Sequence, residues 1–210
     1  MYVPPAFRED RTEILHAAIR AASLPVLIGT GPANEGGGLI ASHVPMLLDP
    51  DAGPLGTLIG HVARANPHIH ATGQALAIFQ GPDAYITPSW YATKRETEKV
   101  VPTWNYIAVH ATGTLEWFTD PDRLLDVVTR LTNRYEGARE KLGANPWAIS
   151  DAPADFVVGM LKGITGFVLP IAHLEGKWKM SQNRPQADRQ GVAAGLTADG
   201  KADIATLIPR

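Results

Sequence analysis

The chain of 210 residues contains no cysteine, so disulfide bonds and thiolate sites are excluded. No apolar run approaches the length that a membrane-spanning helix needs. The first residues, Met1 to Pro5, lack the basic and apolar regions of a signal peptide. These absences lead us to expect a soluble cytoplasmic protein.

Neither positive nor negative charge is in large excess. The chain has 19 Lys and Arg against 21 Asp and Glu, which gives a net charge of -2 at pH 7, and no long basic run. Proteins that bind DNA directly usually present a basic face. Direct DNA binding stays open, but neither charge nor a helix-turn-helix pattern supports it. Charged residues make up 19% of the chain, which favours a surface buried against a partner subunit.

The sequence lacks the motifs of several catalytic classes. It has no GxSxG, no HExxH and no paired carboxylates, so hydrolase chemistry gains no support. The Gly-rich stretch Gly31 to Gly38 lacks the lysine of a phosphate-binding P-loop, and no GxGxxG follows a predicted strand. His68 and His70 have no third ligand nearby, so we predict no metal site. The catalytic residues are unknown at this stage.

Hydrophobic periodicity predicts strands that come in clusters with short connections. This order favours an antiparallel sheet or barrel with helices packed outside it, a mostly β fold of the α+β type, rather than a Rossmann fold. We predict helices at residues 9–22, 120–142, 156–163 and 185–196, strands at 26–30, 39–48, 56–60, 75–79, 105–118, 164–171 and 178–181, and an exposed loop at 93–100.

Residues Gln80 to Tyr106 hold two of the five Trp and three of the five Tyr, set among Gly, Pro, Ser, Thr and Asn. Aromatic rings beside turn residues and amides suit the wall of a site for a flat ligand with a polar edge. Packing at one end of a barrel explains the same composition equally well. Both interpretations stay open on the sequence.

Eight segments, in order through nearly the whole chain, carry a resemblance to a known family. Together they resemble the PaiB-like family of FMN-binding negative transcriptional regulators, which is related to the pyridoxamine-phosphate oxidases. The segments are Met1–Pro4 with Phe7, Ile40–Pro45, Gly60–Pro67, Phe79–Ile86, Ser89–Tyr91, Val101–Tyr106, Lys162–Phe167 and Lys179–Arg184.

The resemblance implies an antiparallel split β-barrel that dimerises and holds FMN between its subunits. It implies a single domain over residues 1–196 with peripheral helices, and a polar, loosely held C-terminal tail at 197–210. The residues that it places at the cofactor are Ser42, His43, His61, Arg64, Asn66, Thr103, Trp104, Asn105, Lys179, Ser181, Gln182, Asn183 and Arg184.

Several of these residues have a structural alternative. His61 and Arg64 suit a phosphate-binding corner or an ordinary surface. Ser42 and His43 are neighbours in a predicted strand and point to opposite faces, so at most one can face a given groove. Asn66 suits a turn before proline, and Asn183 could cap the last helix.

Three functions are consistent with this reading. The first is a flavin-dependent oxidoreductase or flavin-handling protein, in which the flavin supplies the redox chemistry. The second is a transcriptional regulator that acts without flavin chemistry. The third is a haem-binding split-barrel protein, with His43, His61 or His110 as the iron ligand.

Overall fold

The computed structural model describes residues 1–31, 38–140, 142–143 and 145–209. The chain forms two compact units, each with its own core. The central unit comprises Ile19–Phe79 and His110–Leu174, and the terminal unit comprises Met1–Ala18, Gln80–Val109 and Glu175–Arg210. The division that the sequence suggested, one domain through residue 196, stays a prediction.

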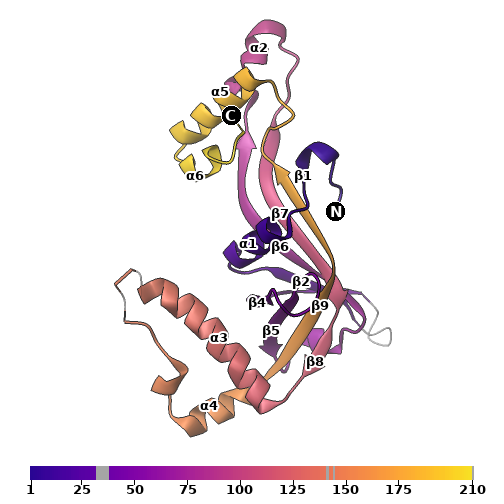
Figure 1. The fold of residues 1–210 in the computed structure, drawn as a ribbon, viewed down its shortest axis with the longest axis vertical. Helices are drawn as coiled ribbons and strands as arrows, with labels where there is room; N and C mark the ends of the chain where they lie inside the picture. Colours follow the sequence, from indigo (N-terminus) through magenta and orange to yellow (C-terminus); the bar gives the residue numbers. More distant parts are fainter. Residues whose placement is uncertain (32–37, 141, 144, 210) are drawn as a thin grey trace. The chain divides into compact units, whose positions relative to one another are not determined.

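The strands form one sheet of order β3-β2-β6-β7-β9-β5-β4, with β1 and β8 each paired to β9 (Figure 1). Every pair whose register is defined is antiparallel. A mostly β fold with packed helices is therefore confirmed. The strands are β1 Arg8–Glu9, β2 Val26–Thr30, β3 Leu39–His43, β4 Met46–Asp49, β5 Thr57–Ala63, β6 Gln74–Ile86, β7 Thr103–Thr114, β8 Glu116–Phe118 and β9 Ile164–Lys179.

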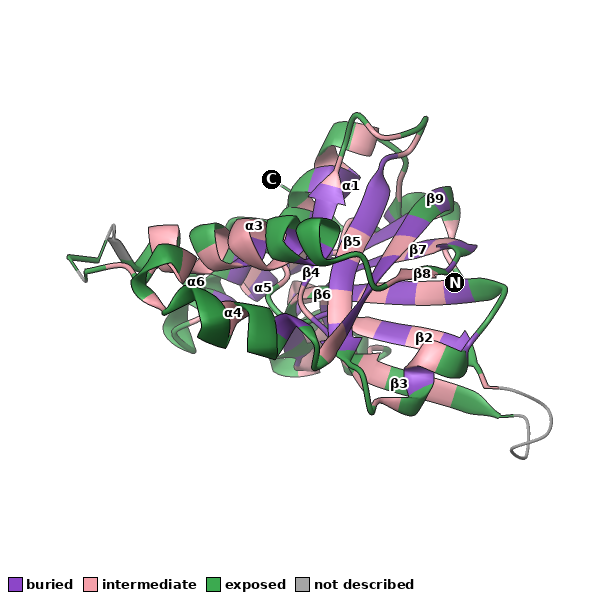
Figure 2. Cartoon of the chain, turned by 90° about the horizontal axis from the view of Figure 1, so that it is seen from below, coloured by how far each residue is buried: buried purple, intermediate pink, exposed green. Residues whose placement is uncertain are grey.

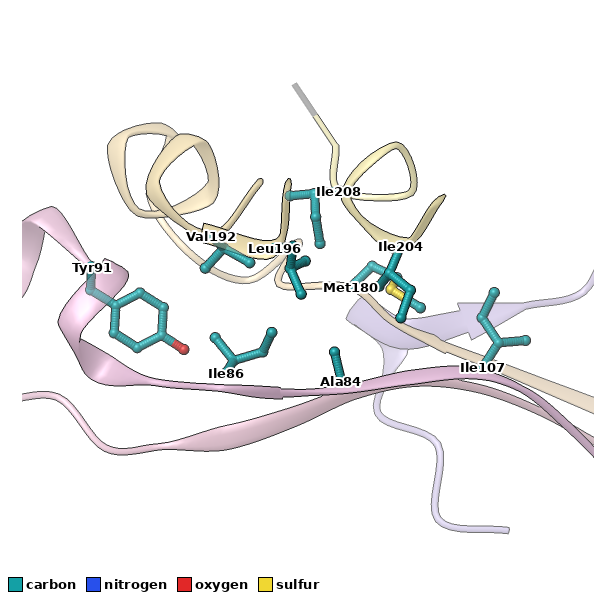
Figure 3. Packing of buried hydrophobic residues seen from close by; sticks show 9 residues of the cluster. All are labelled: Ala84, Ile86, Tyr91, Ile107, Met180, Val192, Leu196, Ile204 and Ile208. Atoms are coloured by element: carbon teal, nitrogen blue, oxygen red, sulfur yellow. The ribbon is translucent and has the colours of Figure 1, made fainter. Parts of the chain in front are cut away.

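The core of the terminal unit lies between strand residues and the C-terminal helices. Its buried members are Ala84, Ile86, Tyr91, Ile107, Met180, Val192, Leu196, Ile204 and Ile208 (Figure 3). The helical segments of this unit are η1 Pro5–Phe7, η4 Pro88–Trp90, α2 Ala92–Thr97, α5 Gln186–Ala198 and α6 Ala202–Ala205, and α1 Thr12–Ala21 begins in it.

The C-terminal residues are not the loose tail that the sequence led us to expect. Ile204 and Ile208 are buried beside Leu196, and the Arg189 Nε donates a hydrogen bond of 3.0 Å to the Pro209 carbonyl. The prediction was wrong because Ile204 and Ile208 were read as part of a polar stretch, although both pack into the core of the terminal unit, Ile204 from α6 and Ile208 from the turn after it.

In the central unit, helix α3 (Pro121–Glu140) covers one face of the strands. Leu124, Val127 and Leu131 are buried, and the last two pack with Leu47. Asp120 accepts a hydrogen bond of 2.9 Å from the Arg123 amide, as expected of a helix cap. Leu142, the last residue of the predicted helix 120–142, lies beyond the end of α3 and is exposed.

The remaining helical segments of the central unit are η3 Pro67–His70, η5 Ile149–Asp151 and α4 Ala154–Leu161. Figure 2 shows α4 largely in the colour of exposed residues. No helix in the described part of the chain is long and apolar enough to cross a membrane.

Several predicted elements differ from the structure in their bounds or their type. The predicted strand 39–48 is broken near Pro45 into β3, which pairs with β2, and β4, which pairs with β5. Proline lacks the amide hydrogen that a ladder needs. The predicted loop 93–100 contains helix α2. The Gly-rich stretch Gly31 to Gly38 lies mostly outside the described residues.

Candidate functional site

Three cations gather at the end of β9 in the terminal unit. Lys177 is buried, and its Nζ donates to the Tyr2 carbonyl at 3.1 Å. The Lys179 Nζ donates to the Thr103 hydroxyl and the Trp104 carbonyl. The next basic residue, Arg184, follows the strand. We call Lys177, Lys179 and Arg184 the cation cluster.

Among the described residues, the cation cluster forms no ion pair with a carboxylate. Burial lowers the pKa of Lys179, and the charges of Lys177 and Arg184 lower it further. Positive charges that repel one another in a partly buried place favour an anion between them.

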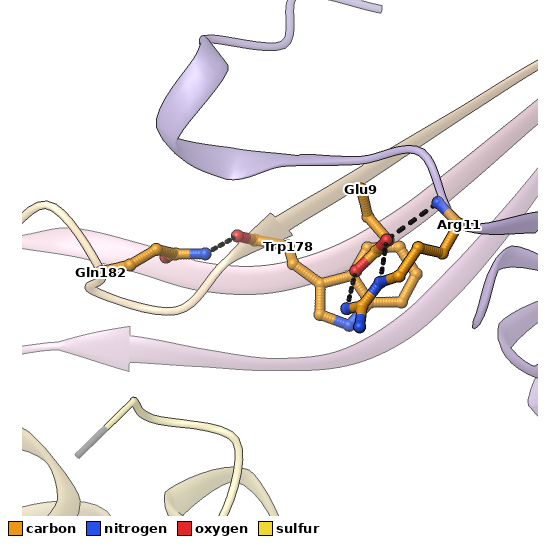
Figure 4. Close-up of polar contacts among 4 residues, drawn as sticks. All are labelled: Glu9, Arg11, Trp178 and Gln182. Atoms are coloured by element: carbon orange, nitrogen blue, oxygen red, sulfur yellow. Dashed lines mark hydrogen bonds and ion pairs between the residues drawn. The ribbon is translucent and has the colours of Figure 1, made fainter.

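Two carboxylates of the same unit have other partners. Glu9 lies on β1, whose register places it opposite Gly176 of β9, and its oxygens accept from the Arg11 side chain at 2.8 and 2.5 Å (Figure 4). The Arg11 hydrogen bond lowers the pKa of Glu9. The buried Asp188 accepts from the Thr93 amide and hydroxyl, both at 2.9 Å. Neither is left to neutralise the cation cluster.

The turn after β9 holds Arg184 in place through local hydrogen bonds. The Gln182 side chain reaches back to the Met180 amide and to the Trp178 carbonyl (Figure 4). The Arg184 amide donates to the Ser181 carbonyl at 2.9 Å. The Arg184 guanidinium then lies over the Tyr91 ring, 4.7 Å from its centroid, a cation–π contact.

An exposed aromatic pair adjoins the cation cluster. Tyr85 and Trp104 are 48% and 52% exposed, and their rings meet edge to face at 5.8 Å between centroids. Trp104 is linked to the cluster because its carbonyl accepts from Lys179. In contrast, Tyr91 is buried in the core. The aromatic segment thus supplies both core packing and an accessible ring surface.

The side chains of Asn105 and Ser181 are hydrogen-bonded to each other. Both are buried, and the Asn105 amide donates to the Ser181 hydroxyl at 2.9 Å. Gln182 is likewise engaged with the backbone. Asn183 is exposed, and it does not cap the last helix, because Pro185 is the N-cap of α5. These residues shape the turn, whereas Lys179 and Arg184 carry its charge.

The candidates in the central unit form a separate network. The Ser42 hydroxyl lies 3.2 Å from the Asn66 amide nitrogen and 3.0 Å from Nδ1 of the buried His68. Asn66 also caps η3 by accepting from the His68 amide at 2.9 Å. Burial lowers the pKa of His68. His43 is exposed on the other face of β3, as the alternation predicted.

His61 and Arg64 line different cavities. His61 faces an apolar cavity bordered by α3 and α4, and burial lowers its pKa. Arg64 is exposed and lines a smaller cavity with Lys162, where its guanidinium reaches the Ile164 carbonyl at 3.5 Å. A shared phosphate role for the two residues therefore gains no support from their surroundings.

Sequence reasoning missed Lys177, Tyr85 and His68. Lys177 and Lys179 are two apart on one strand, so they share a face, and this period-two signal was available. Tyr85 was noted only as one of several aromatics. His68 was considered only as a metal ligand. Asn66 bonds its backbone amide, as an Asx-turn does with any residue two positions on, whereas the side-chain contact with Ser42 joins residues 26 positions apart and leaves no local signal.

The family model described as "Putative FMN-binding domain" matches residues 1–173. The chain belongs to this FMN-binding family. The resemblance to PaiB-like proteins is thereby confirmed, and FMN is the cofactor of this family member. The cation cluster and the Tyr85–Trp104 pair fit that cofactor, because FMN combines a dianionic phosphate with a flat ring.

Relatives of this FMN-binding family member span nearly its whole length. An uncharacterised protein of Emericella nidulans is 33% identical over 242 residues, covering 99% of this chain and 96% of that protein. The protease synthase and sporulation protein PAI 2 of Bacillus subtilis is 32% identical over 199 residues, covering 93% and 89%.

The fold of this chain is similar to that of a protein whose structure has been solved. The FAD and heme binding protein of Mycobacterium smegmatis superposes with a TM-score of 0.57, covering 90% of this chain and 80% of that one, at 14% identity. The split-barrel fold that the sequence predicted is confirmed, and at this identity the likeness extends to the fold alone.

Proposed function

We propose that the protein is a homodimeric, FMN-dependent redox protein with the flavin at the subunit interface. The observation that carries this proposal is Lys179, which belongs to an unneutralised cation cluster and also bonds the backbone of the exposed Trp104. Lys179 therefore links the cation cluster, which suits the phosphate, to the exposed Trp104, which suits the ring. When bound, FMN supplies reversible electron and hydride transfer.

In this proposal each group of residues has a distinct part. Lys179 and Arg184 neutralise the phosphate, with Lys177 adding to the positive field. Tyr85 and Trp104 pack against the flat ring. Asn105, Ser181 and Gln182 hold the turn in shape, Thr103 positions Lys179, and Asn183 stands exposed beside them. Ser42, His43, Arg64 and Asn66 of the central unit stay predicted contacts of the cofactor and are given no part in this site.

The phosphate role can be tested by comparing FMN with riboflavin, which lacks the phosphate. We expect Lys179→Ala and Arg184→Ala to weaken FMN binding about 10-fold or more each, because a hydrogen bond to a charged group contributes about 1.5–3 kcal/mol. Riboflavin binding should change little. Flavin fluorescence titration of the apoprotein measures both affinities.

Matched controls are available in the same unit. Lys99→Ala and Arg95→Ala each remove one cation from an exposed position, so they preserve the change in net charge without touching the cation cluster. Both should leave FMN binding close to that of the unchanged protein. Equal affinity for FMN and riboflavin in the unchanged protein would refute the phosphate role.

Flavin-linked regulation is a second candidate function. It is favoured by the name of the Bacillus subtilis relative, which refers to protease synthesis and sporulation. The net charge of -2 gives direct DNA binding no electrostatic advantage. Saturable, salt-dependent retention of a defined promoter fragment by the purified protein would support direct action, and its absence at low salt would exclude it.

A further inference from the structure

The central unit contains an apolar cavity that the proposed flavin contacts do not use. It has a volume of about 280 Å³. Its walls come from α3, α4, η5 and the ends of β5 and β9, and its lining is almost entirely apolar. The residues that matter for the argument are His61, Trp147, Phe156, Met160 and Ile164.

His61 is the one imidazole in the lining of this cavity. Its Nδ1 is buried without a hydrogen-bond partner, so the ring meets the cavity through its other edge, which carries Nε2. Burial lowers the pKa of His61, so the ring is neutral near pH 7 and carries one N–H.

The position of that proton follows from the burial of Nδ1. In protein interiors, N–H groups without a partner are rarer than under-used acceptor lone pairs. The favoured tautomer therefore leaves Nδ1 as a buried lone pair and places the hydrogen on Nε2. The cavity then offers one N–H donor in an otherwise apolar surface, and such a donor calls for an acceptor oxygen on the ligand.

The walls define the rest of the ligand. Trp147 and Phe156 are about half exposed, and Met160 is 58% exposed, so apolar surface borders the cavity that no part of its own unit covers. Aromatic rings and a thioether make favourable contacts with another ring. The volume lies just below the range of about 300–1,000 Å³ typical of sites for drug-sized ligands. A single-ring or two-ring compound is the appropriate size.

We propose that this cavity binds a small, neutral aromatic carbonyl compound, with its ring against Trp147, Phe156 and Met160 and its oxygen bonded to His61 Nε2. The proposal does not depend on the role of the cation cluster, since the ligand has no phosphate. The earlier prediction that His61 contacts FMN is untested, and the apolar surroundings suit the carbonyl ligand better than a phosphate.

Acetophenone and ethylbenzene are suitable probes, because they have similar shapes and differ in the carbonyl oxygen. Ligand-detected saturation-transfer NMR on the full chain measures both affinities. We expect acetophenone to bind about two- to tenfold more tightly than ethylbenzene, the range for one neutral hydrogen bond. In a nitrogen-15 spectrum of the imidazoles, acetophenone should shift the His61 Nε2 resonance.

Variants separate the oxygen contact from the apolar contact. His61→Phe should remove the preference for acetophenone while ethylbenzene still binds, and His70→Phe, at an exposed histidine of the same unit, should preserve the preference. Phe156→Ser on the exposed face of α4 should weaken both probes several-fold. If His61→Phe does not fold, the nitrogen-15 shift in the unchanged protein decides the question.

In the absence of FMN, three results would overturn the proposal: no binding of either probe, equal binding of the two probes, or a preference for acetophenone that survives His61→Phe. The titration is repeated with saturating FMN. If FMN displaces acetophenone competitively, the cavity belongs to the flavin site and the proposal fails. Undisturbed acetophenone binding supports a separate site, whether or not the phosphate test at Lys179 succeeds.

Discussion

Ser181 determines the backbone path that presents the cation cluster. It is buried and has a φ of 61°, a left-handed conformation that non-glycine residues rarely adopt. Such a conformation costs about 1–2 kcal/mol. The hydrogen bond from Asn105 and the return of Gln182 to the backbone offset this cost locally. The neighbouring Arg184 is thereby held over Tyr91, and it forms no ion pair with the carboxylates of the described residues.

His68 links the polar network of the central unit to pH. Its side chain is fully buried, its Nε2 has no partner, and burial lowers its pKa below the ordinary value near 6.5. The unfolded chain therefore binds a proton more readily than the folded one, and stability rises with pH in this range. The stabilisation is complete above about pH 6.5 and is lost as the pH falls towards the lower folded-state pKa.

Replacement of this histidine should weaken the pH dependence. We expect the free energy of unfolding of His68→Gln to fall less between about pH 7.5 and about pH 5.5 than that of the unchanged protein. Urea unfolding at each pH measures the difference. His70→Gln changes an exposed histidine of the same turn and should keep the original slope. An unaltered slope in His68→Gln would refute the assignment.

At the scale of elements, two glycines of α5 allow its backbone to pack closely against Trp90 in the terminal unit. A Cβ added at Gly191 would overlap the Trp90 carbonyl, and one added at Gly195 would overlap the Trp90 indole. The helix backbone therefore approaches Trp90 more closely than any side chain would allow. This contact explains why α5 keeps two interior glycines, although glycine is unfavourable there by about 0.5–1 kcal/mol relative to alanine.

This close approach gives opposite expectations for two similar substitutions. Gly191→Ala should destabilise the protein by about 1–3 kcal/mol, because overpacking exceeds the gain in helix propensity. Gly137→Ala in α3 meets no atom within 4 Å, and it should stabilise by about 0.5–1 kcal/mol. Denaturant unfolding distinguishes the two. Equal stabilisation by both would contradict the packing of Trp90 on α5.

The elements also show what a single sequence can predict. Helix α3 and strand β7 were predicted because their apolar patterns are long. Strand β6 was predicted to stop at Phe79, yet it continues to Ile86 through Gly81 and Pro82. Gly81 fits there because Ile107 occupies the space of its missing Cβ, which would lie 2.8 Å away. Such pairing overrides local turn signals and is not visible in one sequence.

The same limit applies to the candidate site. Sequence patterns placed Lys179, Arg184, Asn105 and Ser181 in one functional group, because all are polar and lie in segments shared with the family. The structure divides them by their hydrogen bonds: Asn105 and Ser181 satisfy each other, whereas the two cations have no carboxylate. Which polar groups are already satisfied depends on contacts between residues 76 positions apart, and residue type does not encode that.

At the scale of the whole molecule, each unit leaves large apolar side chains exposed. Tyr2 and Trp104 of the terminal unit are 83% and 52% exposed, and Leu39 of the central unit is 82% exposed. Exposed aromatic rings that contact each other, as Tyr85 and Trp104 do, favour an interaction site. The net charge of -2 presents little repulsion between two copies. Both features support the proposed homodimer.

A flavin held between two subunits would couple cofactor binding to dimerisation. FMN that binds the dimer and not the monomer must stabilise the dimer by mass action. We therefore expect dilution to dissociate the apoprotein at a higher protein concentration than the FMN-loaded protein, as measured by light scattering. The apparent affinity for FMN should also fall as the protein is diluted.

Variants test whether the effect on the dimer comes from the bound cofactor. Lys179→Ala should reduce the effect of FMN on the dimer because it weakens FMN binding, while Lys99→Ala should not. A monomer that binds FMN with an affinity independent of protein concentration would show that one copy completes the flavin site.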